Sequence, residues 1–146
     1  MIRDMLPHDI DMVCELLIDM KNDSPTYRHV PDDWDYVSGN LQNMLQDPNT
    51  IALIDDGYRG FMLGGCHQQW YSAAREAYEY TLYVSIPWRG STLAPRLIKA
   101  FEDRARSLGA RRVFAGTTTG NNEDRTIALY ERMGYMRLSP PLRKDL

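Results

Sequence analysis

A strand, a sharp turn and a long helix follow one another within residues 78–109, and this stretch constrains the fold more than any other. Apolar residues recur on one face of the predicted helix, and Gly109 ends it. These apolar residues are Leu93, Leu97, Ile98, Phe101, Ala105 and Leu108. A strand that runs through a tight turn into a helix leaves backbone N–H groups without partners. Together with the helix dipole, these donors predict a site for an anion such as a phosphate or diphosphate.

The turn between strand and helix, residues 85–90, has residues suited to its shape. Pro87 ends the strand, and Gly90 gives the turn conformational freedom. Ser91 or Thr92 can cap the helix, and Pro95 stands where a missing N–H costs little. The local sequence therefore favours a helix that begins directly after the turn.

The other elements are predicted from hydrophobic periodicity and from turn residues. The strands are residues 1–4, 50–54, 58–70, 78–84, 111–116 and 135–138, and the helices are residues 8–20, 31–46 and a last helix, capped by Asn121 or Asn122, that runs to Met133. With the central helix included, the order is β-α-α-β-β-β-α-β-α-β. This order predicts an α/β (α+β) fold in which helices flank a mixed, mostly antiparallel central sheet.

The composition of the 146 residues predicts one domain over residues 1–146, because the apolar and charged fractions of 43% and 25% are ordinary for a globular protein. No segment resembles a membrane span or a signal peptide, so a cytoplasmic protein without a membrane partner is expected. Cys14 and Cys66 have no metal-ligand spacing, and neither have the three histidines. The net charge of −3 argues against a nucleic-acid partner and favours a cationic amine.

Two motifs at the proper separation resemble the GNAT superfamily of N-acetyltransferases. In the first, four residues separate Val84 from Arg89 and Gly90, which open the long helix. The second is the stretch IALYERMGY at residues 127–135, where a Leu-Tyr pair precedes Gly and an aromatic residue. The resemblance implies the GNAT fold and direct transfer of an acetyl group from acetyl-CoA to a primary amine of a small molecule or protein. A homodimer is one assembly that it leaves open.

The resemblance also implies how CoA would be held. The family's phosphate loop corresponds to Arg89, Gly90, Ser91, Thr92, Leu93 and Ala94. Thr92 stands where the family has Gly, and its hydroxyl could replace an N–H contact. The backbone of Leu82, Tyr83 and Val84 would pair with the pantetheine amides. The family commonly has Asn seven residues before the helix Tyr, but Glu123 is found here, so Asn122 is the candidate substitute.

Tyr130 matches the family's general acid, which would protonate the leaving thiolate; the alternative for Tyr130 is a core tyrosine. The proton acceptor has three candidates. Strand alternation places Glu76 on the same face as Tyr78 and Tyr80 but further out, whereas Glu79 is out of phase unless a bulge intervenes. Each glutamate could instead be solvated or paired, and water ordered by the two tyrosines is the third candidate.

Two rival functions stay open at this point. An acyl-CoA-binding or regulatory module could keep the fold and lose turnover, which the departures at Thr92 and Glu123 would explain. Acetylation of an aminoacylated tRNA is the other rival, and the acidic net charge argues against it. No cysteine lies near the motifs, so a covalent acyl intermediate is disfavoured.

Overall fold

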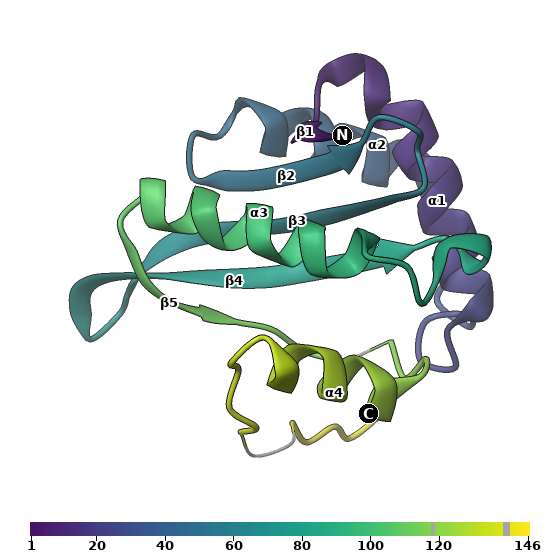
Figure 1. Ribbon diagram of the computed structural model, residues 1–146. Helices are drawn as coiled ribbons and strands as arrows, with labels where there is room; N and C mark the ends of the chain where they lie inside the picture. The colour runs from purple at the N-terminus through teal and green to yellow at the C-terminus, as the bar shows by residue number, and fades with distance from the viewer. Residues whose placement is uncertain (118, 139–140) are drawn as a thin grey trace.

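The computed structural model describes residues 1–117, 119–138 and 141–146 (Figure 1). Its elements are, in chain order, β1 (Ile2–Asp4), a 3-10 turn (Pro7–Asp9), α1 (Ile10–Asp23), α2 (Trp34–Gln46), β2 (Thr50–Asp55), β3 (Gly60–Gln69), β4 (Ser72–Val84), a second 3-10 turn (Ile86–Trp88), α3 (Leu93–Ser107), β5 (Ala110–Phe114) and α4 (Glu123–Arg132). No helix among these residues is long and apolar enough to cross a lipid bilayer.

Within the described residues, one sheet has the strand order β1-β2-β3-β4-β5. Neighbouring strands are antiparallel except β4 and β5, which are parallel and joined through α3. The predicted mixed, mostly antiparallel sheet is therefore confirmed. Strand β4 is longer than predicted, because its first residues continue the antiparallel ladder with β3 as far as the pair Ser72 and Gln69.

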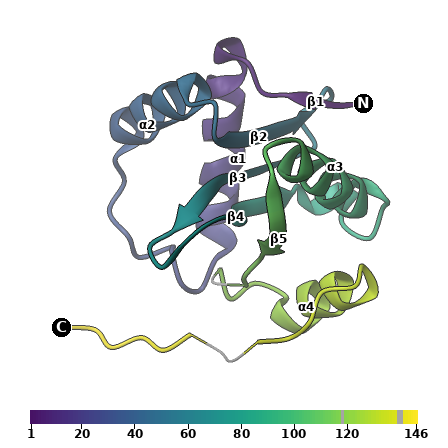
Figure 2. The ribbon, with the colours of Figure 1, turned by 90° about the vertical axis from the view of Figure 1, so that its left-hand side faces the viewer.

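Helices cover both faces of the sheet, with α1 and α2 on one side and α3 on the other (Figure 2). Side chains alternate along β2, β3 and β4, so these three strands contribute to both cores. Leu53 and Met62 belong to the core beneath α3, whereas Ile54 and Phe61 belong to the core beneath α1 and α2. This two-sided burial explains why β2 is a nearly continuous apolar run rather than an alternating one.

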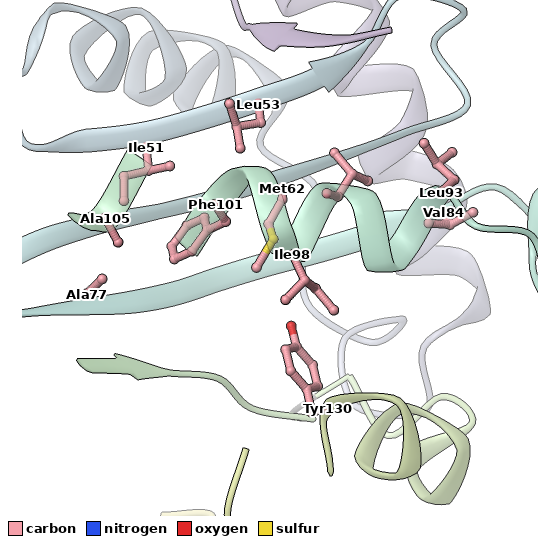
Figure 3. Packing of buried hydrophobic residues seen from close by; sticks show 11 residues of the cluster. Ile51, Leu53, Met62, Ala77, Val84, Leu93, Ile98, Phe101, Ala105 and Tyr130 are labelled. Atoms are coloured by element: carbon pink, nitrogen blue, oxygen red, sulfur yellow. The ribbon is translucent and has the colours of Figure 1, made fainter. Parts of the chain in front are cut away.

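Helix α3 buries one apolar face against the sheet. Leu97, Ile98 and Phe101 are completely buried, which confirms the predicted apolar face. Figure 3 shows Ile98 and Phe101 in this core. Gly109 follows the helix with φ +85°, a left-handed conformation that glycine adopts without strain. The helix therefore ends where the sequence predicts, and the chain turns directly into β5.

The predicted strand at residues 135–138 is wrong, because these residues form no strand. The Tyr135 amide donates to the Tyr130 carbonyl at 3.0 Å, and Gly134 has φ +93°, which together hold the chain against the last turn of α4. The Tyr135 ring packs edge-on against Tyr130, with 4.9 Å between ring centroids. The side chains of Met136 and Leu138 are exposed, so the apolar alternation that resembled a strand does not bury a face.

The buried carboxylate of Asp9 links the start of the chain to the β2–β3 turn through hydrogen bonds. Its oxygens accept hydrogen bonds from the Arg3 guanidinium at 2.7 and 2.9 Å, from the Tyr58 hydroxyl at 2.8 Å and from the Leu6 amide at 2.8 Å. The bond from Arg3 is the main reason why the pKa of Asp9 lies well below its usual range.

We expect Asp9→Asn to lower the free energy of unfolding at pH 7 by about 2–3 kcal/mol, because the buried cluster loses its charged acceptor. Because folding lowers the pKa of Asp9, its carboxylate stabilises the native state at pH values above the ordinary pKa of 3.8. This stabilisation is lost as the pH falls below that value. The difference between wild type and variant should therefore shrink below about pH 4.

Urea unfolding at several pH values measures this difference. Glu15→Gln, at an exposed position of α1, is the matched control and should change stability by less than about 0.5 kcal/mol. A difference between wild type and Asp9→Asn that does not depend on pH would contradict the assignment.

Candidate active site

The edge of β4 that faces β5 is paired along only part of its length. Pairing between the two strands ends at Tyr78 and Phe114, although β4 continues to Val84. Figure 1 shows the two strands diverging from this point, with α4 below the opening. The second half of β4 therefore presents an unpaired backbone edge to the space between the strands.

A bulge in β4 decides which side chains enter this space. Leu63 of β3 pairs with Thr81, but the next residue, Gly64, pairs with Glu79, so Tyr80 is the extra residue. Without the bulge, Glu79 and Leu82 would lie on opposite faces of β4. With Tyr80 as the extra residue, Glu79 lines the same cleft as Leu82. The Glu79 carboxylate accepts a hydrogen bond from the Gly116 amide at 3.0 Å.

The cleft between the diverging strands has a volume of about 310 Å³. It is lined by the free half of β4, the turn after it, the first residues of α3, the loop after β5 and one face of α4. A second hollow of about 1000 Å³ lies against β5, α4 and the chain after α4. That hollow is larger, but it contains no residue of the turn, so it lacks the predicted anion site.

The turn has backbone donors without partners beside the cleft; Gly90 and Ala94 line the cleft, whereas Thr92 does not. Gly90 has φ +85°, and among the described residues the amides of Gly90, Thr92 and Ala94 have no hydrogen-bond partner. The Ser91 hydroxyl accepts from the Leu93 amide at 3.2 Å, so Ser91 satisfies one helix donor. Thr92 takes the N-cap position without a side-chain cap bond. Three unpaired amides at a helix N-terminus form an arrangement that binds anions.

The side chain of Arg89 turns away from these amides. Its Nε donates to the Val84 carbonyl at 3.0 Å, its Nη2 lies 3.4 Å from an Asp23 carboxylate oxygen, and the guanidinium lies 5.6 Å from the centroid of the Tyr83 ring. The Val84 carbonyl is thus already occupied. The rest of the predicted backbone edge, at Leu82 and Tyr83, is not paired with β5.

Tyr130 enters the cleft from α4, and its hydroxyl points toward α3 and the sheet (Figure 3). Only 6% of Tyr130 is exposed, and its hydroxyl has no hydrogen-bond partner among the described residues. Burial is the main cause that raises the pKa of Tyr130 well above its usual range, and the charge of Glu79 raises it further. Tyr130 is therefore a buried phenol that keeps its proton.

The two candidate bases have different surroundings. Burial raises the pKa of Glu79 to about 7, against the opposing effect of the Gly116 and Leu82 amides. Glu76 is buried outside the cleft, where the Arg112 guanidinium approaches to 2.6 Å and the Gln69 amide donates at 2.8 Å. Glu76 is thus a paired carboxylate, and Glu79 is the carboxylate that faces Tyr130.

The start of α4 places its polar residues differently from the family pattern. Asn122 has φ 48° and ψ 45°, precedes the helix and lines the cleft. Glu123, the first helical residue, accepts a hydrogen bond from the Thr117 hydroxyl at 3.1 Å and lies outside the cleft. The structure therefore brings the amide, and not the carboxylate, to the cleft.

Several residues that line the cleft lie outside the set predicted from the sequence, namely Met20, Trp88, Arg125 and Leu129. For α4 a signal was present, because Asn122, Arg125 and Leu129 recur at helical spacing. For Met20 of α1 there was none. Among the described residues, no group of three His, Cys, Asp or Glu side chains is placed to hold a metal ion.

Comparison with known proteins shows which family the chain belongs to. A sequence profile of the acetyltransferase (GNAT) family matches residues 12–135. The chain belongs to the GNAT acetyltransferase family. The matched region contains the cleft, the turn and α4 up to Tyr135, so the family's shared part includes every candidate residue described above.

Individual GNAT relatives are distant. YdgE of Bacillus subtilis (strain 168), an uncharacterized N-acetyltransferase, is 32% identical over 72 residues, which cover 49% of this chain and 45% of YdgE. The match thus spans less than half of that relative. Glucosamine-6-phosphate N-acetyltransferase from Arabidopsis thaliana shares 12% identity and a TM-score of 0.76, with 99% and 97% of the two chains covered. The enzyme AAC(6')-Iy, in complex with CoA-S-monomethyl-acetylneamine, shares 16% identity and a TM-score of 0.78, with 100% and 97% covered.

The bulge should be sensitive to any side chain at Gly64. A Cβ there would lie 2.2 Å from the Tyr78 carbonyl oxygen and 2.6 Å from the Phe101 ring. We expect Gly64→Ala to destabilise the protein by about 1–3 kcal/mol, because backbone and core must both shift. Gly39→Ala is the matched control: it lies inside α2 with no atom within 4 Å, and should stabilise by up to about 1 kcal/mol. Equal unfolding free energies for the two variants would contradict this description of the bulge.

Proposed function

We propose that the protein is an acetyl-CoA-dependent N-acetyltransferase that transfers an acetyl group directly to the primary amine of a small molecule. One observation supports this most strongly: a carboxylate with a raised pKa, an unpaired buried phenol and unpaired amides at a helix N-terminus share one cleft. Each supplies a different requirement of acyl transfer from a thioester to an amine.

The residues of the cleft fit CoA. The amides of Gly90, Thr92 and Ala94 would hold the diphosphate, in the manner of helix N-termini that bind phosphate groups. The free edge of β4 around Leu82 would pair with the pantetheine amides, and Asn122 can add an amide contact. When bound, acetyl-CoA supplies an acetyl group that is activated as a thioester.

Two side chains would move the protons. The Glu79 carboxylate would accept a proton from the acceptor's ammonium group, which leaves a neutral amine able to attack. The Tyr130 hydroxyl would donate its proton to the leaving sulfur, so that CoA departs as a neutral thiol. A base with a pKa of about 7 suits the first step near neutral pH, and a phenol that stays protonated suits the second.

The distribution of charge favours a cationic small molecule as the acceptor. Residues 1–50, which include α1 and α2, contain ten acidic and three basic residues, whereas residues 51–146 contain ten acidic and fourteen basic residues. The side that carries α1 and α2 would therefore attract an ammonium group, and the remainder would attract CoA. The neighbours named for glucosamine-6-phosphate and acetylneamine also point to amines of small molecules.

Thiol release from acetyl-CoA across a panel of small polyamines and amino sugars tests the proposal. Release that depends on the amine supports it. Binding of acetyl-CoA without release for any amine would favour the acyl-CoA-binding module. Absence of binding would contradict both.

We expect Tyr130→Phe to lower kcat by about 100-fold while the Kd for CoA changes less than about twofold, because only the transferable proton is lost. Tyr135→Phe is the matched control, since Tyr135 packs against Tyr130 but lies outside the cleft. Steady-state kinetics and calorimetry measure the two quantities. An unchanged kcat in Tyr130→Phe would remove Tyr130 from the proposed mechanism.

The pH dependence of kcat/KM should report the ionisation of Glu79. The carboxylate must be ionised to accept a proton, so kcat/KM should rise with pH and level off above about 7. We expect Glu79→Gln to lose about 100-fold in kcat/KM and to lose this inflection. Glu123→Gln, a neighbouring exposed carboxylate outside the cleft, should keep the wild-type profile. A profile in Glu79→Gln that still inflects near 7 would show that another group is the base.

A further inference from the structure

We propose that Arg125 of α4 is a phosphate-binding residue, which holds the diphosphate of CoA against the unpaired amides of the turn. This inference rests on the proposed use of CoA. It names Arg125 as the positively charged group of the diphosphate site, because the turn itself supplies only backbone amides.

The guanidinium of Arg125 lies beside the turn. A Cβ placed on Gly90 would lie 2.9 Å from Nη2 of Arg125, so the guanidinium lies directly against the turn. Arg125 shares its face of α4 with Asn122 and Leu129, and all three line the cleft. The guanidinium thus reaches the turn from the opposite wall of the cleft.

Nothing else in the described part of the chain engages this side chain. Arg125 is exposed and has no hydrogen bond or ion pair among the described residues. The other arginine of the turn, Arg89, is committed to the Val84 carbonyl and to Asp23. Arg125 is therefore the guanidinium beside the turn that is free to bind an anion.

Two independent features then meet at one point. The amides of Gly90, Thr92 and Ala94 are donors without acceptors, and Arg125 is a cation without a counterion. The amides and the helix dipole supply partial charges, whereas a diphosphate carries full negative charges. A guanidinium can donate two parallel hydrogen bonds to phosphate oxygens, which makes arginine well suited to complete such a site.

The spacing along α4 limits this role to one arginine. Arg132 also lines the cleft, but it lies seven residues further along the helix, which is roughly 10 Å along the axis. The contact with Gly90 belongs to Arg125. The inference therefore concerns a local contact with the diphosphate rather than a general attraction of CoA to basic residues.

Calorimetric titration of the full chain with CoA and with 3'-dephospho-CoA tests the inference. Both probes contain the diphosphate, and only CoA has the 3'-phosphate. We expect Arg125→Ala to weaken both ligands by the same factor of about tenfold, which corresponds to the loss of a charged hydrogen bond. Arg125→Lys should recover only part of the loss, because a lysine cannot form the paired contact.

Arg111→Ala is the matched control. It removes an exposed guanidinium of β5 that lies outside the cleft, and it should change either Kd by less than about twofold. Melting curves of all variants confirm that they are folded. Unchanged affinities in Arg125→Ala would overturn the inference, and so would a loss confined to CoA, which would place Arg125 on the 3'-phosphate. Failure of the wild type to bind either probe would instead overturn the proposed use of CoA, and this inference with it.

Discussion

The rest of the structure depends on the point at which β4 and β5 stop pairing. Beyond Tyr78 and Phe114 the parallel strands separate, and the space between them is closed on its other side by α4. A fully paired β5 would satisfy the edge of β4 and leave no room for a ligand. The cleft, the exposed half of β4 and the approach of α4 to the turn are all consequences of this separation.

Within the cleft, burial acts on both Glu79 and Tyr130, the two groups proposed to accept and to donate a proton. Burial disfavours the charged form of both side chains, so it raises the pKa of Glu79 toward neutrality and that of Tyr130 further above its usual range. The carboxylate can then exchange a proton near neutral pH, while the phenol retains its own. In the proposed mechanism, this shared burial makes Glu79 the proton acceptor and Tyr130 the proton donor.

Hydrophobic periodicity and the resemblance to a known family were enough to predict the mixed sheet, α3 and the turn before it. The remaining features depend on contacts between segments that are distant in the sequence. The Gly64-Gly65 pair hinted at a bulge, but strand alternation alone could not place Tyr80 as the extra residue, because that depends on register against Gly64. The direction of Arg89 depends on Asp23, which lies on a different element. The strand expected at residues 135–138 failed because the hydrogen bonds that end α4 outweighed a weak apolar alternation.

We propose above all that backbone amides at the start of α3 bind the diphosphate of CoA. A nitrogen–proton correlation NMR titration of the full chain with CoA tests this most directly. We expect the amide signals of Gly90, Thr92 and Ala94 to shift most and to saturate with a single Kd. Saturation with shifts elsewhere while these three signals stay in place would contradict it, as would a spectrum that CoA leaves unchanged.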